Sequence, residues 1–325
     1  MHGITLTAPV SDGETRRRCR AVRAREHHCA LQGERWRKAP WRRVYSFAMR
    51  IQLFSDLHLE RYPDFCPRFA PDIDVVVLAG DIGSYQPGSR LSGDDFGLER
   101  FSPLRPGANC PTVLYVPGNH EFDALEFDET YARLRHTCER LGITWLEREV
   151  VTLGHVRFVG TTLWSDFEAL VGNEDTVTKQ MQLRNKAFRA ANYYLKKNTT
   201  LRLGEPVLAE EMREMALECQ AWLQAALCVP FDGTTVAVTH FAPSIRSADP
   251  RYGLTPGTAG FCNALDALFP HAQVWMHGHL HCFNDYVVEG KKEGKSWACR
   301  VVANPLGYLS KGEQAAFREH LVIEV

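Results

Sequence analysis

Five short apolar segments, each followed closely by Asp, Asn or His, constrain the fold of this chain more than any other feature. Segments of this length that are rich in Val, Ile, Leu and Phe are typical of buried β-strands. Because ligands collect at the carboxyl ends of the strands in open α/β sheets, we expect the polar residues that follow these segments to form one site. The five segments span residues 51–54, 75–79, 112–116, 235–239 and 273–276.

The third segment shows the pattern most clearly. It ends in Pro117-Gly118, a pair that breaks a strand and turns the backbone. Asn119, His120 and Glu121 follow at once. Taken alone, an Asn-His pair after a turn is more often a hydrogen-bonded loop than a catalytic site. Its repetition after the other segments favours a functional interpretation.

The other four segments are followed by the same kinds of residue. Asp56 and His58 follow the first, and because they stand two apart they would point the same way from an extended chain. Asp81 follows the second, and a carboxylate directly after a fully apolar strand needs a cation or a set of amide donors. The fourth leads into His240, and the fifth leads into His-Gly-His-Leu-His at 277–281.

Taken together, these strand-end residues form a candidate metal-binding set. Carboxylates and imidazoles with one amide and no thiolate suit divalent manganese, iron or zinc in a reactive site rather than a structural zinc site. Seven ligands exceed the needs of one ion, and a shared Asp81 could hold two ions about 3.5–4 Å apart. The predicted ligands are Asp56, His58, Asp81, Asn119, His240, His279 and His281, with His120 beside them.

The remaining pattern of residues 49–325 predicts one α/β (α+β) domain without an internal repeat or linker. The stretch 162–229 interrupts the strand rhythm and predicts a helical insertion, either a core-facing layer or a lid over the site. Further elements are a helix at 124–141, a hairpin at 150–159, helices at 180–197 and 207–227, and closing strands at 284–288 and 297–303.

Residues 1–48 differ in composition from the rest. They hold eleven Lys and Arg against four acidic residues, a net charge of +7, whereas residues 49–325 carry a net charge of −8. No apolar periodicity in this tail could bury a face, which predicts disorder. A nucleic-acid or membrane-surface arm, an organelle transit peptide and translated upstream sequence are the alternatives. We favour the last, because Met49 immediately precedes the first strand and the tail is poor in Ser.

A chain that begins at Met49 should therefore match the full-length chain in melting temperature and turnover. Calorimetry and a turnover assay on both chains would check this. A loss of several degrees on truncation would show that the tail is docked on the folded part.

Composition limits the cellular compartments and the partners that we expect for the protein. The apolar segments fall far short of the ~20 residues of a membrane span. The ten cysteines contain no Cys-x-x-Cys pair, which favours a reducing, cytoplasmic setting with no zinc ribbon or redox motif. The net charge of −1 makes nucleic acid an unlikely partner.

In order, the motifs are Asp-x-His, Gly-Asp, Gly-Asn-His-Glu, a lone His after a strand, and Gly-His-x-His. This order resembles the signature of the calcineurin-like metallophosphoesterases over essentially all of residues 49–325. Thr239 to Ser244 and Asn304 to Tyr308 look like a bacterial-type subgroup of small phosphohydrolases. The resemblance implies a four-layer αββα sandwich and a dinuclear metal-dependent phosphoesterase acting on phosphomonoesters or phosphodiesters by metal-bound hydroxide attack.

The resemblance also implies roles for the site residues. His120 would be the general acid, and His277 has no family role. Separately, we hypothesise that residues 162–229, with Tyr252 and Tyr308, shape substrate choice from above the metals. Asn304 is a further candidate substrate-binding residue. The first ion would be bound by Asp56, His58, Asp81 and His281, and the second by Asp81, Asn119, His240 and His279.

One departure from the related phosphoprotein phosphatases concerns substrate. Those enzymes extend Gly-Asp with Asp-Arg-Gly, whereas Asp81 here is followed by Ile82 and Gly83. The change argues against phosphoserine or phosphothreonine and removes the usual partner that orients the catalytic histidine. Two alternatives stay open: a nuclease, which would need a basic groove, and a non-catalytic scaffold, which would tend to lose ligands.

Overall fold

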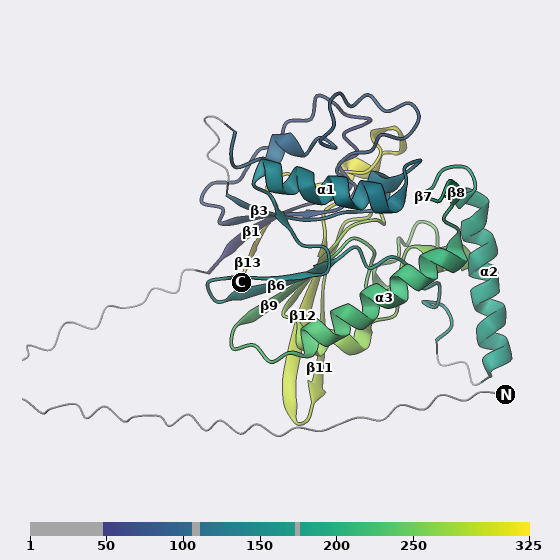
Figure 1. Ribbon diagram of the computed structural model, residues 1–325. Helices are drawn as coiled ribbons and strands as arrows, with labels where there is room; N and C mark the ends of the chain where they lie inside the picture. Colours follow the sequence, from purple (N-terminus) through teal and green to yellow (C-terminus); the bar gives the residue numbers. More distant parts are fainter. Residues whose placement is uncertain (1–47, 106–110, 173–175) are drawn as a thin grey trace, which may run out of the picture. The chain divides into compact units, whose positions relative to one another are not determined.

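The computed structural model describes residues 48–105, 111–172 and 176–325 (Figure 1). Apart from Ala48, the predicted tail lies outside the described residues. Within them the chain forms a five-stranded sheet, a six-stranded sheet and a small two-stranded ribbon. The described part of the chain contains no helix that is both long and apolar enough to cross a membrane.

The first sheet has the strand order β13-β1-β2-β3-β4. Strands β1, β2, β3 and β4 run parallel to one another, and β13 at the edge pairs antiparallel with β1. Parallel pairing places the residues that follow β1, β2 and β3 at one edge of the sheet. The strands are β1 (Arg50–Phe54), β2 (Val75–Ala79), β3 (Thr112–Val116), β4 (Thr144–Trp145) and β13 (Val322–Glu324).

The second sheet has the order β11-β12-β10-β9-β6-β5. Its central strands β12, β10, β9 and β6 are parallel, and an antiparallel hairpin strand closes each edge. The strands are β5 (Glu149–Leu153), β6 (Val156–Thr161), β9 (Thr234–Thr239), β10 (Val274–His277), β11 (Asn284–Lys292) and β12 (Lys295–Ala303).

The two sheets pack face to face through an apolar core. Alternate residues of the strands, such as Ile51 and Leu53 in β1 and Val236 and Val238 in β9, belong to this shared core and are fully buried. Helix α1 (Phe127–Leu141) covers the outer face of the first sheet, and α3 (Ala209–Cys228) packs on β6 of the second (Figure 1). The predicted four-layer αββα sandwich is therefore confirmed.

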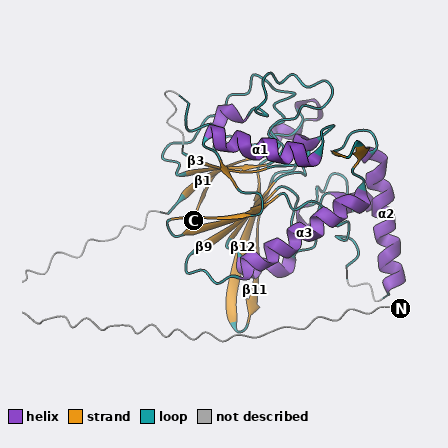
Figure 2. Ribbon diagram, in the orientation of Figure 1, coloured by secondary structure: helices purple, strands orange, loops and turns teal. Residues whose placement is uncertain are grey.

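The chain between β6 and β9 forms α2 (Val177–Leu195), the ribbon β7 (Leu201–Arg202) with β8 (Glu205–Pro206), and α3 (Figure 2). Seven residues of α3 are buried, whereas Ala187 is the only buried residue of α2. Helix α2 instead contacts a short 3-10 helix at Pro256–Gly260. The segment thus supplies both a core-facing helix and a more peripheral one.

Most predicted elements are confirmed, with shifts of a few residues at their ends. Helix α1 begins at Phe127 rather than at Ala124, because Ala124 has a left-handed backbone with φ of 60° and cannot belong to a right-handed helix. The predicted hairpin turns at Gly154, as β5 and β6 show.

Candidate metal centre

The parallel strands of both sheets end at one place, where the predicted ligands meet. The backbone N–H of Gly278, after β10, donates to the carbonyl of His240, after β9, at 3.0 Å. Across the sheets, the backbone N–H of His279 donates to Oδ1 of Asp56 at 2.9 Å. Residues that are more than 220 positions apart in the chain are thereby held in one cluster.

Two overlapping groups of side chains could each hold a metal ion, and the ligand atoms within each group lie within 4.8 Å of one another. Asp81 belongs to both groups. The first group is Asp56, His58, Asp81 and His281, and the second is Asp81, His240 and His279. Asn119 stands beside the second group, with its Oδ1 3.2 Å from Nε2 of His240.

The imidazoles point their Nε2 atoms inward in at least three cases. Nε2 of His58 and Nε2 of His281 lie 3.0 Å apart. Nε2 of His281 is 3.5 Å from Oδ1 of Asp56, and Nε2 of His240 is 3.3 Å from Oδ2 of Asp81. Nitrogen and carboxylate lone pairs that converge in this way match a cation site.

The opposite ring nitrogens of these histidines are held by acceptors. Nδ1 of His58 bonds Oε1 of Glu60 at 3.0 Å, and Nδ1 of His281 bonds Oε2 of Glu313 at 2.6 Å. Nδ1 of His240 bonds the carbonyl oxygen of Ala79 at 2.9 Å. An acceptor at Nδ1 places the proton there and leaves Nε2 free as a metal ligand. Sequence analysis missed these acceptors.

Two buried polar atoms of the site have no hydrogen-bond partner: Oδ2 of Asp81 and Nε2 of His279. A buried carboxylate oxygen or imidazole nitrogen without a partner is costly, and a bound cation removes that cost. The donor set and these two atoms fit the divalent ions that the sequence predicts.

The electrostatics of the cluster keep its carboxylates ionised. Burial raises the pKa of Asp81, but His240 and His120 outweigh burial and hold it well below its ordinary value. Burial lowers the pKa of His240, and Asp81 reverses the effect and raises it to about 9. A protonated His240 would therefore pair with an ionised Asp81, and metal binding at Nε2 of His240 would release that proton.

Five of the seven predicted ligands have a left-handed backbone, which is uncommon for residues other than glycine. This finding corrects the expectation of an extended chain at Asp56 and His58, whose φ angles are 52° and 48°. The tight bends after the strands direct the side chains of these predicted ligands toward one another. The other three are Asp81 (54°), His279 (71°) and His281 (47°).

Two glycines of the motifs are required by close approach to these ligands. A Cβ at Gly118 would collide with Oδ1 and the backbone nitrogen of Asp81, and a Cβ at Gly278 would lie 2.6 Å from Oδ2 of Asp56. Each glycine thus lets a carboxylate lie directly against the backbone.

Glu121 organises the loops rather than facing the ligands. Its Oε2 accepts from the backbone N–H of Gly118 at 2.8 Å and of Asp81 at 3.2 Å, and its Oε1 accepts from Ile82 at 2.7 Å. The side chain is fully buried. It ties the turn after β3 to the turn after β2.

Changing Glu121 to Gln should destabilise the fold, because an amide NH₂ group would replace one acceptor oxygen and face backbone N–H donors. Leaving such buried donors unpaired costs about 1–3 kcal/mol. Denaturant unfolding of Glu121→Gln against the parent chain measures this. Glu129→Gln, at an exposed position of α1, is the control, and equal stability of both variants would contradict the assignment.

His120 lies beside the metal-binding groups and has its own carboxylate partner. Its Nδ1 lies 2.5 Å from Oδ2 of Asp123, and its Nε2 lies 3.9 Å from Oδ2 of Asp81. Burial lowers the pKa of His120, but Asp123 and Asp81 outweigh burial and raise it well above its ordinary value. The sequence offered no certain orienting partner, and the structure places Asp123 in that position, three residues after His120.

The three predicted substrate-binding residues lie in different surroundings. Asn304 is fully buried, its amide donates to the carbonyls of Leu53 and Arg318, and its oxygen accepts from the N–H of Arg318. We therefore correct its role to a structural one. Tyr308 stacks on the ring of His58 at 4.4 Å, whereas Tyr252 is 67% exposed and lies beside Arg251.

His277, which had no predicted role, is the last residue of β10 and is fully buried. Its Nε2 lies 2.9 Å from Oγ of Ser247, which in turn lies 2.9 Å from the hydroxyl of Tyr286. These contacts satisfy its ring inside the fold.

A family model described as calcineurin-like phosphoesterase matches residues 49–283. The chain therefore belongs to the calcineurin-like phosphoesterase family and is a metal-dependent phosphohydrolase. Among its relatives is an uncharacterized protein, L509, of Acanthamoeba polyphaga mimivirus. The two are 23% identical over 303 residues, which cover 85% of this chain and 97% of the relative.

A crystal structure of phosphopantetheinyl hydrolase (PptH) from Mycobacterium tuberculosis has a similar fold. The match has a TM-score of 0.57 and 20% sequence identity, and it covers 86% of this chain and 96% of that chain. The likeness extends over the whole sandwich and supports the fold assignment.

Proposed function

We propose that this chain is a dinuclear phosphoesterase in which Asp81 bridges two divalent ions. The observation that carries the proposal is the membership of Asp81 in both candidate metal-binding groups, with its buried Oδ2 lacking a hydrogen-bond partner and lying 3.3 Å from Nε2 of His240. The first ion would be held by Asp56, His58, Asp81 and His281, and the second by Asp81, Asn119, His240 and His279. Manganese, iron and zinc suit these ligands.

Bound divalent ions would supply activation of an attacking water and neutralisation of the phosphoryl charge. The protein residues contribute orientation and proton transfer. Asp123 and Asp81 raise the pKa of His120 and so favour its protonated form, which is the form that can donate a proton to the leaving oxygen. Asp123 fixes the ring through Nδ1, which leaves Nε2 as the donating atom.

The substrate in this proposal is a small phosphomonoester or phosphodiester. The name of the hydrolase from Mycobacterium tuberculosis makes a phosphopantetheinyl ester one compound to include among the diesters. We place Tyr308 at the edge of the site as a substrate contact, because its ring lies against His58.

Metal analysis combined with a phosphoester panel tests the proposal. We expect close to two divalent ions per chain, hydrolysis of a p-nitrophenyl phosphate mono- or diester, and loss of hydrolysis with chelator that returns when metal is restored. A single tightly bound ion in fully active protein would contradict the dinuclear assignment. Activity that survives chelation and metal removal would contradict metal dependence at this site.

A further inference from the structure

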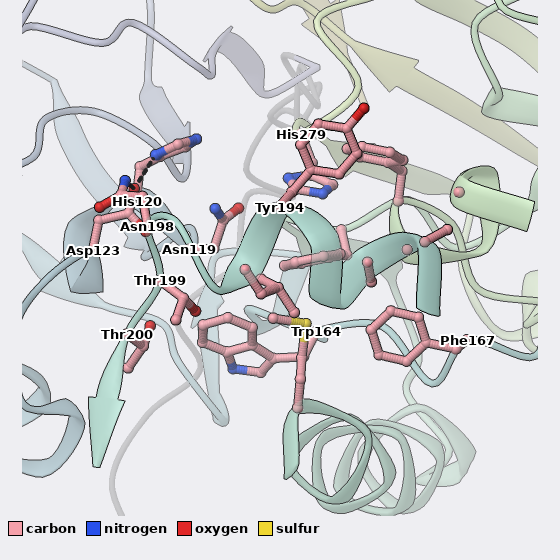
Figure 3. A pocket seen from close by; sticks show the side chains of 18 residues that line it. Asn119, His120, Asp123, Trp164, Phe167, Tyr194, Asn198, Thr199, Thr200 and His279 are labelled. Carbon is pink, nitrogen blue, oxygen red and sulfur yellow. Dashed lines mark hydrogen bonds and ion pairs between the residues drawn. The ribbon is translucent and has the colours of Figure 1, made fainter. Parts of the chain in front are cut away.

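An apolar cavity of about 220 Å³ opens directly beside the metal-binding groups. Asn119, His120 and His279 belong to its wall, so the cavity is continuous with the site. Figure 3 shows His120, Asp123 and Asn198 together at one end of the cavity, with Trp164 and Phe167 farther along the wall.

Aromatic and small side chains from several separate segments form the apolar wall. The loop after β6 contributes Trp164 and Phe167, whose backbones are left-handed with φ of 45° and 62°. A left-handed backbone at residues other than glycine is strained, and the surrounding structure has to hold Trp164 and Phe167 in this conformation. Phe241 lies against the ring of His279 with centroids 3.9 Å apart, which joins the apolar wall to a predicted metal ligand.

Helix α2 and the 3-10 helix at Pro256–Gly260 pack against each other, and both contribute small residues to the cavity wall. Ala190 and Ala191 come from α2, and Gly257 and Gly260 come from the 3-10 helix. A Cβ at Gly260 would lie 3.5 Å from Phe167 and 3.9 Å from Ala191, which is ordinary contact distance. The small residues let the two helices lie close together at this part of the cavity wall.

The polar end of the cavity is organised around His120. Asp123 accepts from Nδ2 of Asn198 at 2.8 Å as well as bonding His120, and Asn198 also donates to Gln86 at 3.0 Å. The carboxylate is thus held in place on two sides. A leaving oxygen that takes a proton from His120 would lie at this end, and the carbon atoms attached to it would extend along the apolar wall.

We propose that this cavity binds the apolar part of the alcohol that leaves phosphorus, so that the preferred substrates are phosphoesters of hydrophobic alkyl or aryl alcohols. The inference rests on the proposed function and adds its substrate class. Because one water takes up about 30 Å³, the cavity has room for about seven waters, which suits one aromatic ring or a short alkyl chain.

Chain-length dependence tests this inference. Burying one methylene favours binding enough to change an equilibrium about fourfold. We expect kcat/KM for ethyl, butyl and hexyl phosphoesters to rise by roughly that factor per methylene until the cavity is full. The esters should be monoesters or diesters, according to which class the phosphoester panel shows to be hydrolysed. Because the three alcohols have similar basicity as leaving groups, the chemical step should be the same for all of them.

A binding measurement gives a second readout that does not depend on turnover. Ethyl-, butyl- and hexylphosphonate cannot lose their alkyl group by hydrolysis of an ester bond. Calorimetric titration into the metal-loaded protein should show Kd falling with the same chain-length dependence. A Kd that is equal for all three compounds would overturn the inference.

Two substitutions that fill the cavity provide the structural test. Ala191→Phe and Gly260→Leu should each reduce the hexyl-to-ethyl ratio of kcat/KM toward one. Gln182→Phe adds the same ring on the exposed side of α2 and should keep the parent ratio. Melting temperature shows whether each variant is folded. Two cavity variants are made so that the test can be completed even if one of them does not fold. An unchanged ratio in a folded cavity variant would overturn the assignment.

The outcomes distinguish this inference from the function on which it rests. Absence of metal-dependent hydrolysis of every ester, including the p-nitrophenyl ester, would overturn the proposed function, and the phosphonate titration would still test the cavity. Hydrolysis of the p-nitrophenyl ester with equal kcat/KM for all chain lengths would overturn only the cavity assignment.

Discussion

Replacing Asp81 with Asn should abolish phosphoesterase activity, with a fall in kcat/KM of at least about 10³-fold, and lower bound metal from two ions to one or fewer. Metal ions contribute several kcal/mol to stabilisation of the transition state, and each 1.4 kcal/mol corresponds to about tenfold in rate. The effect should exceed that of any other single ligand, because Asp81 is the residue that both metal-binding groups share.

The geometry makes this substitution a clean test. Oδ1 of Asp81 accepts from the backbone N–H of His120 at 2.8 Å, and an asparagine oxygen can keep that bond. The change therefore falls on Oδ2, which has no hydrogen-bond partner and lies 3.3 Å from Nε2 of His240. Metal analysis, activity and melting temperature should be measured together, with Asp128→Asn, at an exposed position of α1, as the control. A folded Asp81→Asn protein that keeps two ions and full turnover would contradict the bridging assignment.

Replacing His120 with Ala should slow hydrolysis of an alkyl phosphoester by about 10²- to 10⁴-fold, while a p-nitrophenyl ester keeps much of its rate. The alkoxide leaving group needs a proton, whereas p-nitrophenolate leaves without one. Bound metal should stay unchanged, because the predicted ligand sets do not include His120. Kinetics with both esters and metal analysis of the variant would check each part.

The alternative outcomes assign other roles to His120. Loss of metal would make it a ligand. Equal slowing of both esters with metal retained would show that it stabilises phosphoryl charge or binds substrate. Asp123→Asn is a useful companion, because it should keep the hydrogen bond to Nδ1 but remove the negative charge that raises the pKa of His120.

The strands and the residues that follow them could be predicted because both are local patterns. An apolar run such as 75–79 predicts a buried strand by itself, and Asp81 follows within two positions. The meeting of the two sheets was implied by family resemblance, since no local pattern encodes a contact such as that between Asp56 and His279.

The acceptors that hold the histidines could be predicted only in part. Glu60 lies two residues from His58 and Asp123 lies three residues from His120, so their proximity was available in the sequence. Glu313 lies 32 residues from His281 and carries no signal of its own. The error at Asn304 arose because its motif resembles a site motif, whereas its amide satisfies backbone groups inside the fold.

The left-handed backbone at five predicted ligands limits how this protein can be stabilised by engineering. At Asp56, Asp81 and His281, for example, glycine would relieve backbone strain that costs on the order of 1 kcal/mol or more per residue. The same change would delete a ligand atom that no neighbouring residue replaces. Glycine at Asp56 or Asp81 would also remove the oxygen that accepts from the backbone N–H of His279 or His120, so the relief of strain and the loss of hydrogen bonds oppose each other. A stability screen of this fold should therefore exclude these positions.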